Sequence, residues 1–237
     1  MLTQEECIRY ARMIAIPEIG REGIAKLRKS VVAVIGCGAL GSLCSMYLAG
    51  AGIGTIKIAD FDTIDLSNLQ RQLFFDSSHL GESKASVLSS RLHNLNPGCK
   101  VIENKSIITE RNIREFLNDA DFIIDATDNP DSKFLIDNIC SELGKGYCIG
   151  GVSEFTGQVM SWEPGRTRYS EIFFSADNSS GVTPCSIGGV LGPAAGVVAS
   201  LQAAETLKHI IGCGEMLLDQ IFTINLLTMQ TQLLPLS

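Results

Sequence analysis

Residues 31–41 read VVAVIGCGALG, an apolar run followed directly by a glycine-rich turn. The apolar, largely β-branched run predicts a buried strand. The turn has the G-x-G-x-x-G pattern at Gly36, Gly38 and Gly41, and the apolar residues that follow predict a helix to about Gly50. Because a helix that begins on such a turn offers backbone N–H groups to a phosphate, this stretch predicts a Rossmann-like nucleotide-binding fold.

Asp60 ends the next predicted strand, TIKIAD, and stands 24 positions after Gly36. An acidic side chain at this place can hold the ribose hydroxyls of a nucleotide. The turn and the acid together are still a generic nucleotide signal. A glycine-rich turn without a ligand is the alternative interpretation of the same pattern.

Strand-like and helix-like segments alternate over about the first 150 residues. This order predicts an α/β, Rossmann-like fold with a mainly parallel sheet, helices on both faces, and antiparallel strands added near the C-terminus. We expect a single domain over residues 1–237. It would comprise an N-terminal helical arm (1–30), a nucleotide-binding core (31–152) and a sheet extension (153–237), with residues 165–186 irregular.

The composition excludes several classes of partner. The formal net charge of -7 argues against binding to nucleic acid or to an anionic membrane through bulk electrostatics. The N-terminus lacks the apolar core of a secretion signal, and the apolar stretch 190–201 is too short for a membrane span. Eight cysteines are present without a C-x-x-C pair, so we expect neither a zinc site nor a redox dithiol. A reduced, cytoplasmic protein fits this pattern.

Polar residues that follow the predicted strands form a candidate site. In a doubly wound sheet the carboxyl ends of the first strands border one crevice. Asn68 and Arg71 follow the second strand, Lys84 belongs to the next helix, and Asp128 with Asn129 follows the strand DFIIDAT. Arg and Lys neutralise phosphate oxygens, and a carboxylate holds a hard metal ion. The set therefore favours a triphosphate with Mg²⁺ over the pyrophosphate site of a dehydrogenase.

Each of these residues has a structural alternative. Lys84 can be a solvated charge on a helix, and Arg71 can lie on the surface or in an interface. Asp128 and Asn129 precede a proline and can form a turn and a helix cap. We expect all of them to converge on one site.

Several motifs together resemble the MoeB/ThiF/HesA family, the bacterial relatives of the ubiquitin-activating enzymes. The resemblance covers nearly the whole chain, from about Arg9 to Lys208. SNLQRQ and DATDN are its most specific parts. The motifs are RYARM, IPEIGREG, GCGALG, ADFDTIDLSNLQRQ, GESK, LNP, DATDN, FTGQV and GGVLGPAAGVVASLQAAETLK.

The resemblance implies ATP-dependent adenylation of a small ubiquitin-like sulfur-carrier protein of the ThiS/MoaD type. The carrier's C-terminal Gly-Gly carboxylate would attack the α-phosphate, giving an acyl-adenylate and pyrophosphate. A sulfur-donor protein would later supply sulfur for thiamine, molybdopterin or related biosynthesis. The resemblance also implies a homodimer and a carrier-binding role for residues 153–237.

The resemblance assigns roles to individual residues. Asp128 would bind Mg²⁺, and Arg12 would reach into the ATP site of the partner subunit. The catalytic set would be Arg12, Arg71, Lys84, Asp128 and Cys185. The nucleotide-binding set would be Gly36, Gly38, Ala39, Gly41, Asp60, Asn68, Arg71, Lys84 and Asn129.

The chain also departs from the family pattern. Many relatives bind structural zinc through two C-x-x-C pairs, but residues 167–173 here read TRYSEIF and the end reads TQLLPLS. We therefore expect no structural zinc. Ala39 replaces a common glycine and still offers its backbone N–H, and Met13 stands where Gln is common. Cys185 matches the cysteine that forms a persulfide link to the carrier in the ThiF branch, with an inert loop thiol as the alternative.

Two rival functions remain open at this point. One is an NAD-dependent oxidoreductase on the same nucleotide-binding fold. The other is a non-catalytic module that binds a ubiquitin-like protein without activating it. Loss of the zinc ligands favours the second rival, whereas Arg71, Lys84 and Asp128 oppose it.

Overall fold

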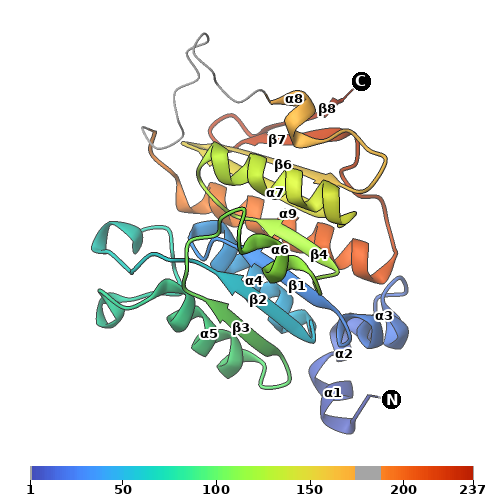
Figure 1. Cartoon of the computed structure of the whole chain (residues 1–237). Coiled ribbons are helices and arrows are strands. Elements are labelled where there is room, and N and C mark those ends of the chain that lie inside the picture. Colours follow the sequence, from blue (N-terminus) through green and yellow to red (C-terminus); the bar gives the residue numbers. More distant parts are fainter. Residues whose placement is uncertain (1, 174–187, 237) are drawn as a thin grey trace.

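The computed structural model describes residues 2–173 and 188–236 (Figure 1). Its eight strands form one sheet in the order β3-β2-β1-β4-β5-β6-β7-β8. The strands are β1 (Val31–Ile35), β2 (Thr55–Ala59), β3 (Lys100–Asn104), β4 (Phe122–Asp125), β5 (Tyr147–Ser153), β6 (Thr156–Trp162), β7 (Gln220–Asn225) and β8 (Gln230–Pro235). The α-helices are α1 (Gln4–Arg9), α2 (Ala11–Ile14), α3 (Gly20–Leu27), α4 (Ala39–Ala51), α5 (Lys84–Leu95), α6 (Ile113–Leu117), α7 (Pro130–Leu143), α8 (Tyr169–Ile172) and α9 (Gly192–Ile211).

The sheet has the predicted mixed topology. Strands β3, β2, β1, β4 and β5 pair in parallel, and β6, β7 and β8 extend the sheet in antiparallel pairs. The chain returns past β1 to form β4 on the side opposite β2, so the strand order reverses between β1 and β4. A crevice outside the carboxyl ends of the strands is expected at such a reversal.

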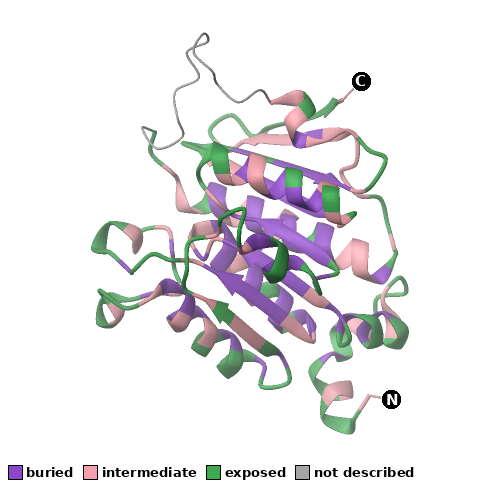
Figure 2. Ribbon diagram, in the orientation of Figure 1, coloured by how far each residue is buried: buried purple, intermediate pink, exposed green. Residues whose placement is uncertain are grey.

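Helices cover both faces of the sheet, as the sequence predicts. Alternate residues of β1 point to opposite faces. Val32 and Val34 join the core formed with α4, α5 and α9, whereas Ala33 and Ile35 join the core formed with α6 and α7. The central strands are buried on both faces (Figure 2), so the site at their carboxyl ends stands on a rigid base.

The ends of several helices differ from the sequence expectations. The sequence predicts helices at about 23–30 and at about 189–211. Helix α3 instead begins at Gly20, and α9 begins at Gly192, where Pro193 occupies the first turn. The sequence Thr3-Gln4-Glu5-Glu6 has the form of a capping box, and Thr3 and Glu6 form that box at the start of α1. The segment predicted to be irregular contains the short helix α8. None of the described helices is long and apolar enough to cross a membrane.

The TRYSEIF segment is anchored by a buried ion pair. Asp137 of α7 is fully buried, and its carboxylate accepts a hydrogen bond at 2.9 Å from Arg168 Nη2 and one at 2.6 Å from the Tyr147 hydroxyl. Within residues 2–173 and 188–236, no group of three or more His, Cys, Asp or Glu side chains is placed to hold a metal ion. The contacts of Asp137 therefore fix the segment against α7 and β5.

We expect Arg168→Met to destabilise the protein, because it leaves the Asp137 carboxylate buried and less well paired. Removal of one partner of a buried ion pair costs about 3–5 kcal/mol, and the partial exposure of Arg168 lowers our expectation to about 2–3 kcal/mol. Arg166→Met is the matched control, since its ion pair with Asp219 is largely exposed. Urea unfolding gives the free energy of unfolding of each variant. A zinc chelator is expected to change neither value. Equal stability of the two variants would contradict the anchoring role.

Candidate functional site

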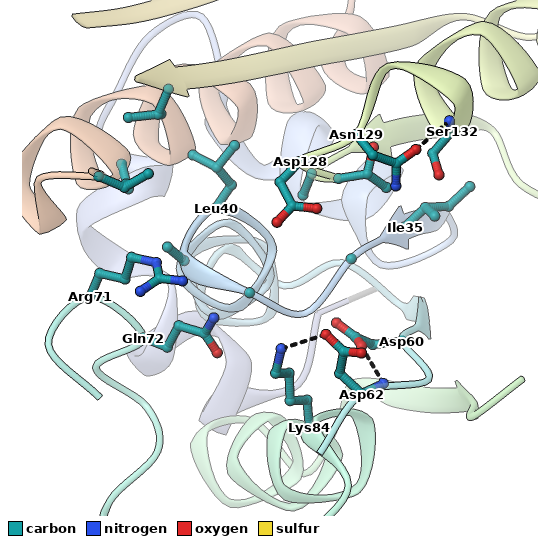
Figure 3. Close-up of a pocket in the computed structure, with 18 of the residues that line it drawn as sticks. Ile35, Leu40, Asp60, Asp62, Arg71, Gln72, Lys84, Asp128, Asn129 and Ser132 are labelled. Atoms are coloured by element: carbon teal, nitrogen blue, oxygen red, sulfur yellow. Dashed lines mark hydrogen bonds and ion pairs between the residues drawn. The ribbon is translucent and has the colours of Figure 1, made fainter. Parts of the chain in front are cut away.

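A pocket of about 520 Å³ lies at the reversal of the strand order (Figure 3). Its walls come from the ends of β1, β2 and β4, the first turn of α4 and the segment after Asp60. The pocket continues to Gly151 and Val152, near the carboxyl end of β5. Its volume is within the range of small-molecule sites.

The glycine turn has the close packing that the motif predicts. Gly36 has a φ of 95°, and a Cβ there would lie 2.7 Å from the carbonyl oxygen of Ala126. A Cβ on Gly41 would lie 1.8 Å from the carbonyl oxygen of Gly36. Gly38 is the N-cap of α4 and lines the pocket together with Ala39, the first helical residue. Gly41 thus packs behind the turn, while Gly38 and Ala39 face the pocket.

Asp60 is held rigidly at the end of β2. Its two carboxylate oxygens accept backbone N–H bonds from Cys37 at 2.7 Å and from Asp62 at 2.8 Å. Burial raises the pKa of Asp60, and the two backbone bonds oppose that rise. The carboxylate keeps lone pairs for ribose hydroxyls, which fits the predicted role.

Lys84 is a buried residue of the site and not a solvated helix charge. Its side chain is 8% exposed, and Nζ lies 2.8 Å from Oδ2 of Asp62. As the first residue of α5, Lys84 is fixed by the cap at Ser83. A phosphate chain in the pocket would therefore meet a lysine that is already oriented by its ion pair.

Arg71 lies where the sequence predicts, and Asn68 does not. Arg71 lines the pocket, and its Nη1 donates to the Ser67 carbonyl at 3.1 Å. Asn68 is absent from the pocket lining, and its Oδ1 accepts the backbone N–H of Asp65 at 3.1 Å. In this structure Asn68 shapes the turn that carries Arg71.

Asp128 and Asn129 both line the pocket, but only the Asn129 side chain is held by a hydrogen bond within the described residues. Asn129 is the N-cap of α7, where its Oδ1 accepts the backbone N–H of Ser132 at 2.8 Å. The predicted capping alternative is thus confirmed for Asn129. Asp128 is exposed to the pocket, and no described residue forms an ion pair or hydrogen bond with its carboxylate. Its oxygens are free for a ligand.

Two predicted residues lie elsewhere. Arg12 is exposed on α2 and does not line the pocket of its own chain. Cys185 lies outside the described residues.

Residues 10–237 match the model of the ThiF family. The chain belongs to the ThiF family.

Relatives of this ThiF-family chain have names that describe adenylyl transfer. It is 36% identical over 226 residues to a probable molybdopterin-synthase adenylyltransferase of Porphyra purpurea, covering 94% of this chain and 59% of that protein. It is 38% identical over 212 residues to the adenylyltransferase and sulfurtransferase MOCS3 of Aedes aegypti, covering 89% of this chain and 48% of the relative. The chain thus spans about half the length of the curated relatives that it matches.

Solved structures share the fold. E. coli MccB crystallised with ATP has a TM-score of 0.81 and 21% identity, over all of this chain and 80% of that chain. A structure titled PaaA has a TM-score of 0.84 and 21% identity, over 99% of this chain and 75% of that chain. These structures confirm the Rossmann-like ThiF fold.

The sequence analysis does not single out three residues that line the pocket of this ThiF-family chain, namely Asp62, Gln72 and Lys133. Asp62 pairs with Lys84, and its place two residues after Asp60 was an available signal. Lys133 is buried on α7, where Nζ lies 3.1 Å from Asp125 Oδ2 and donates to the Gly150 carbonyl at 2.8 Å. Nothing in the sequence distinguishes Lys133 from a surface helix charge. Gln72 lines the pocket beside Arg71.

The Lys133 contacts support the loop that carries Asp128. Asp125 Oδ1 accepts hydrogen bonds from the Thr127 backbone N–H at 2.8 Å and from its hydroxyl at 2.7 Å. Asp125 is fully buried, so its charge needs the pairing with Lys133. Together these bonds join the end of β4 to the middle of β5 and fix the turn that leads to Asp128.

Proposed function

We propose that this chain adenylates the C-terminal glycine carboxylate of a ubiquitin-like sulfur-carrier protein at the expense of ATP. The observation that carries the proposal is the convergence of Arg71, Lys84 and Asp128 on one pocket at the start of α4. Two cations and a helix N-terminus suit a polyphosphate chain. The names of the relatives support the same class of reaction.

The reaction needs charge neutralisation and positioning more than proton transfer. A terminal carboxyl group has a pKa of about 3.5, so the attacking carboxylate is ionised at neutral pH without a general base. One of its oxygens would bond to the α-phosphorus while the bond from that phosphorus to the bridging oxygen breaks and pyrophosphate leaves. Arg71 and Lys84 would stabilise the charge that gathers on the departing phosphates.

The donor set fits Mg²⁺ that arrives with the nucleotide. The described residues offer no complete protein cage for a metal, but Mg²⁺ usually binds one or two carboxylates together with substrate phosphates and water. The unpaired Asp128 meets that requirement. Bound Mg²⁺ would supply charge neutralisation to the phosphates, and the Asp125–Lys133 pair would hold Asp128 in place.

Family membership supports the proposed partners. We propose a sulfur carrier with a C-terminal Gly-Gly, a separate sulfur-donor protein, and a role in molybdopterin, thiamine or related biosynthesis. The arm of the pocket beside Gly151 would receive the carrier's C-terminus. We further propose a homodimer, because Arg12 is exposed and outside the pocket of its own chain, where it can serve the partner's site.

Nucleotide selectivity tests the proposal against an oxidoreductase. Mg·ATP at 100 times its dissociation constant is expected to stabilise the protein by about 2.7 kcal/mol, and NAD to have no effect. Thermal unfolding with each nucleotide is the measurement. Stabilisation by NAD but not by Mg·ATP would replace the proposal with NAD-dependent oxidoreduction.

We expect Cys185→Ala to leave adenylation intact. The attack on ATP uses the carrier's own carboxylate, so no enzyme thiol takes part in that step. ATP–pyrophosphate exchange is the measurement, with sulfur transfer measured separately. A large loss of exchange in a correctly folded variant would assign the thiol to the adenylation step.

A further inference from the structure

Tyr10 is the one buried residue within residues 2–22, all of which the structure describes. It lies between α1 and α2, as the C-cap of the first helix and the N-cap of the second, and neither helix contains a buried residue. Leu2, Met13 and Ile14 pack against the same core but are only partly buried. Tyr10 is therefore the buried anchor of α1 and α2.

The Tyr10 ring packs where α4 and α5 end. Gly52, the C-cap of α4, has a φ of 97°, and a Cβ there would lie 2.8 Å from Cζ of the ring. The Tyr10 hydroxyl accepts a hydrogen bond at 2.9 Å from Nδ2 of Asn96, the buried C-cap of α5. Next to Tyr10, Arg9 Nη1 donates to the Leu95 carbonyl at 3.0 Å. A side chain at position 52 would occupy the space of the ring, so the absence of a Cβ at Gly52 is part of the anchor.

This anchor determines where Arg12 lies. Helix α4 runs from its N-cap Gly38, in the pocket, to Gly52 at Tyr10, and its 13 residues span about 20 Å. Arg12 follows Tyr10 by two residues, which cover at most about 7 Å. It is exposed on α2 and does not line the pocket of its own chain. The anchor thus holds Arg12 near the end of α4 that is remote from that pocket.

We propose that Tyr10 is a positioning residue for the partner subunit: its packing on Gly52 and its bond to Asn96 hold α2 so that Arg12 enters the pocket of a second copy of this chain. The proposal rests on the proposed function, because it needs the homodimer and the adenylation reaction. Tyr10 itself touches no substrate. Binding by an exposed arginine is weakened by the freedom that its side chain and backbone lose, and a fixed backbone lowers that cost.

The test uses Tyr10→Ala, which removes the anchor and keeps Arg12. We expect ATP–pyrophosphate exchange with a Gly-Gly carrier to fall roughly 10- to 100-fold, because a small displacement of a positioned group costs rates of this order. Ile8→Ala is the matched control. Ile8 is an apolar residue of the same pair of helices but is 72% exposed, so its removal should leave exchange near the wild-type rate.

A heterodimer separates positioning from a structural role. Tyr10→Ala paired with Arg71→Ala should regain about half of the wild-type exchange, since one of its two pockets combines Arg71 with a correctly held Arg12 from the other chain. That pocket belongs to the Tyr10→Ala chain, so its activity also shows that this chain folds. If Tyr10 supported only its own subunit, both pockets would be defective and the heterodimer would be as inactive as its parents.

Three results would overturn the proposal: near-normal exchange by the Tyr10→Ala homodimer, full activity of Arg12→Ala, or an inactive heterodimer of Tyr10→Ala with Arg71→Ala beside an active one of Arg12→Ala with Arg71→Ala. If Tyr10→Ala does not fold, Tyr10→Phe takes its place. Loss of the hydroxyl bond to Asn96 should then lower exchange about 3- to 10-fold, and full activity of Tyr10→Phe would overturn the proposal. A wild-type protein without any exchange would instead contradict the proposed function.

Discussion

Asp128→Ala is expected to reduce ATP–pyrophosphate exchange by about a hundredfold or more. Loss of one preorganised group that stabilises transition-state charge costs on the order of 3 kcal/mol. Asp128 lines the pocket, has no partner among the described residues, and is fixed by the Asp125 hydrogen bonds to Thr127. Its removal therefore deletes the proposed Mg²⁺ ligand without breaking a structural contact. Exchange across a Mg²⁺ titration is the measurement.

Asp131→Ala is the matched control for Asp128. Asp131 is an exposed carboxylate in the first turn of α7 and does not line the pocket. Its replacement changes the same charge a few residues away and should leave exchange near the wild-type rate. Near-normal exchange in Asp128→Ala over the whole Mg²⁺ range would show that the metal-binding role belongs to another residue.

Arg12→Ala and Arg71→Ala are each expected to abolish most of the exchange activity, and their mixture to recover part of it. If Arg12 completes the partner's pocket, a heterodimer of the two variants contains one site with both arginines and one with neither. Random mixing of equal amounts would then restore about a quarter of the wild-type sites. The structure motivates this arrangement, because Arg71 lines the pocket and Arg12 lies outside it on α2.

The mixing experiment needs proof that subunits exchange. Differently tagged variants, purified through both tags after mixing, give the heterodimer directly. A heterodimer as inactive as either parent would contradict the arrangement in which Arg12 acts across the interface. A monomeric wild-type protein would also contradict this arrangement, because it requires two subunits.

The fold could be predicted well because its signals are local and repeated. The apolar run before Gly36 and the alternation of strands with helices indicate a parallel sheet, and β1, β2 and β4 lie where VVAVIG, TIKIAD and DFIIDAT predict strands. Helix ends were less well predicted. The first turn of α9 contains Pro193, which displaces its start to Gly192, and α8 is held by Asp137, a residue 31 positions before Arg168 that local patterns do not reveal.

The sequence predicts which charged residues line the pocket, but it does not predict the contacts of the buried side chains. The positions of Lys84, Arg71 and Asp128 follow from the ends of strands, which the sequence locates. The burial of Lys133 depends on how α7 packs against β5, and the burial of Gln72 depends on where its turn meets α4. Asn68 caps its own turn, where its Oδ1 accepts the backbone N–H of Asp65. Such pairings arise only from the folded arrangement.

The most direct test of the account is ATP–pyrophosphate exchange by the wild-type chain with purified sulfur-carrier proteins that end in Gly-Gly. We expect exchange that depends on Mg²⁺, on the carrier and on its terminal glycine, so that a carrier shortened by that residue supports none. Absence of exchange with every such carrier, together with tight binding of one of them, would contradict the account and identify the chain as a non-catalytic binding module.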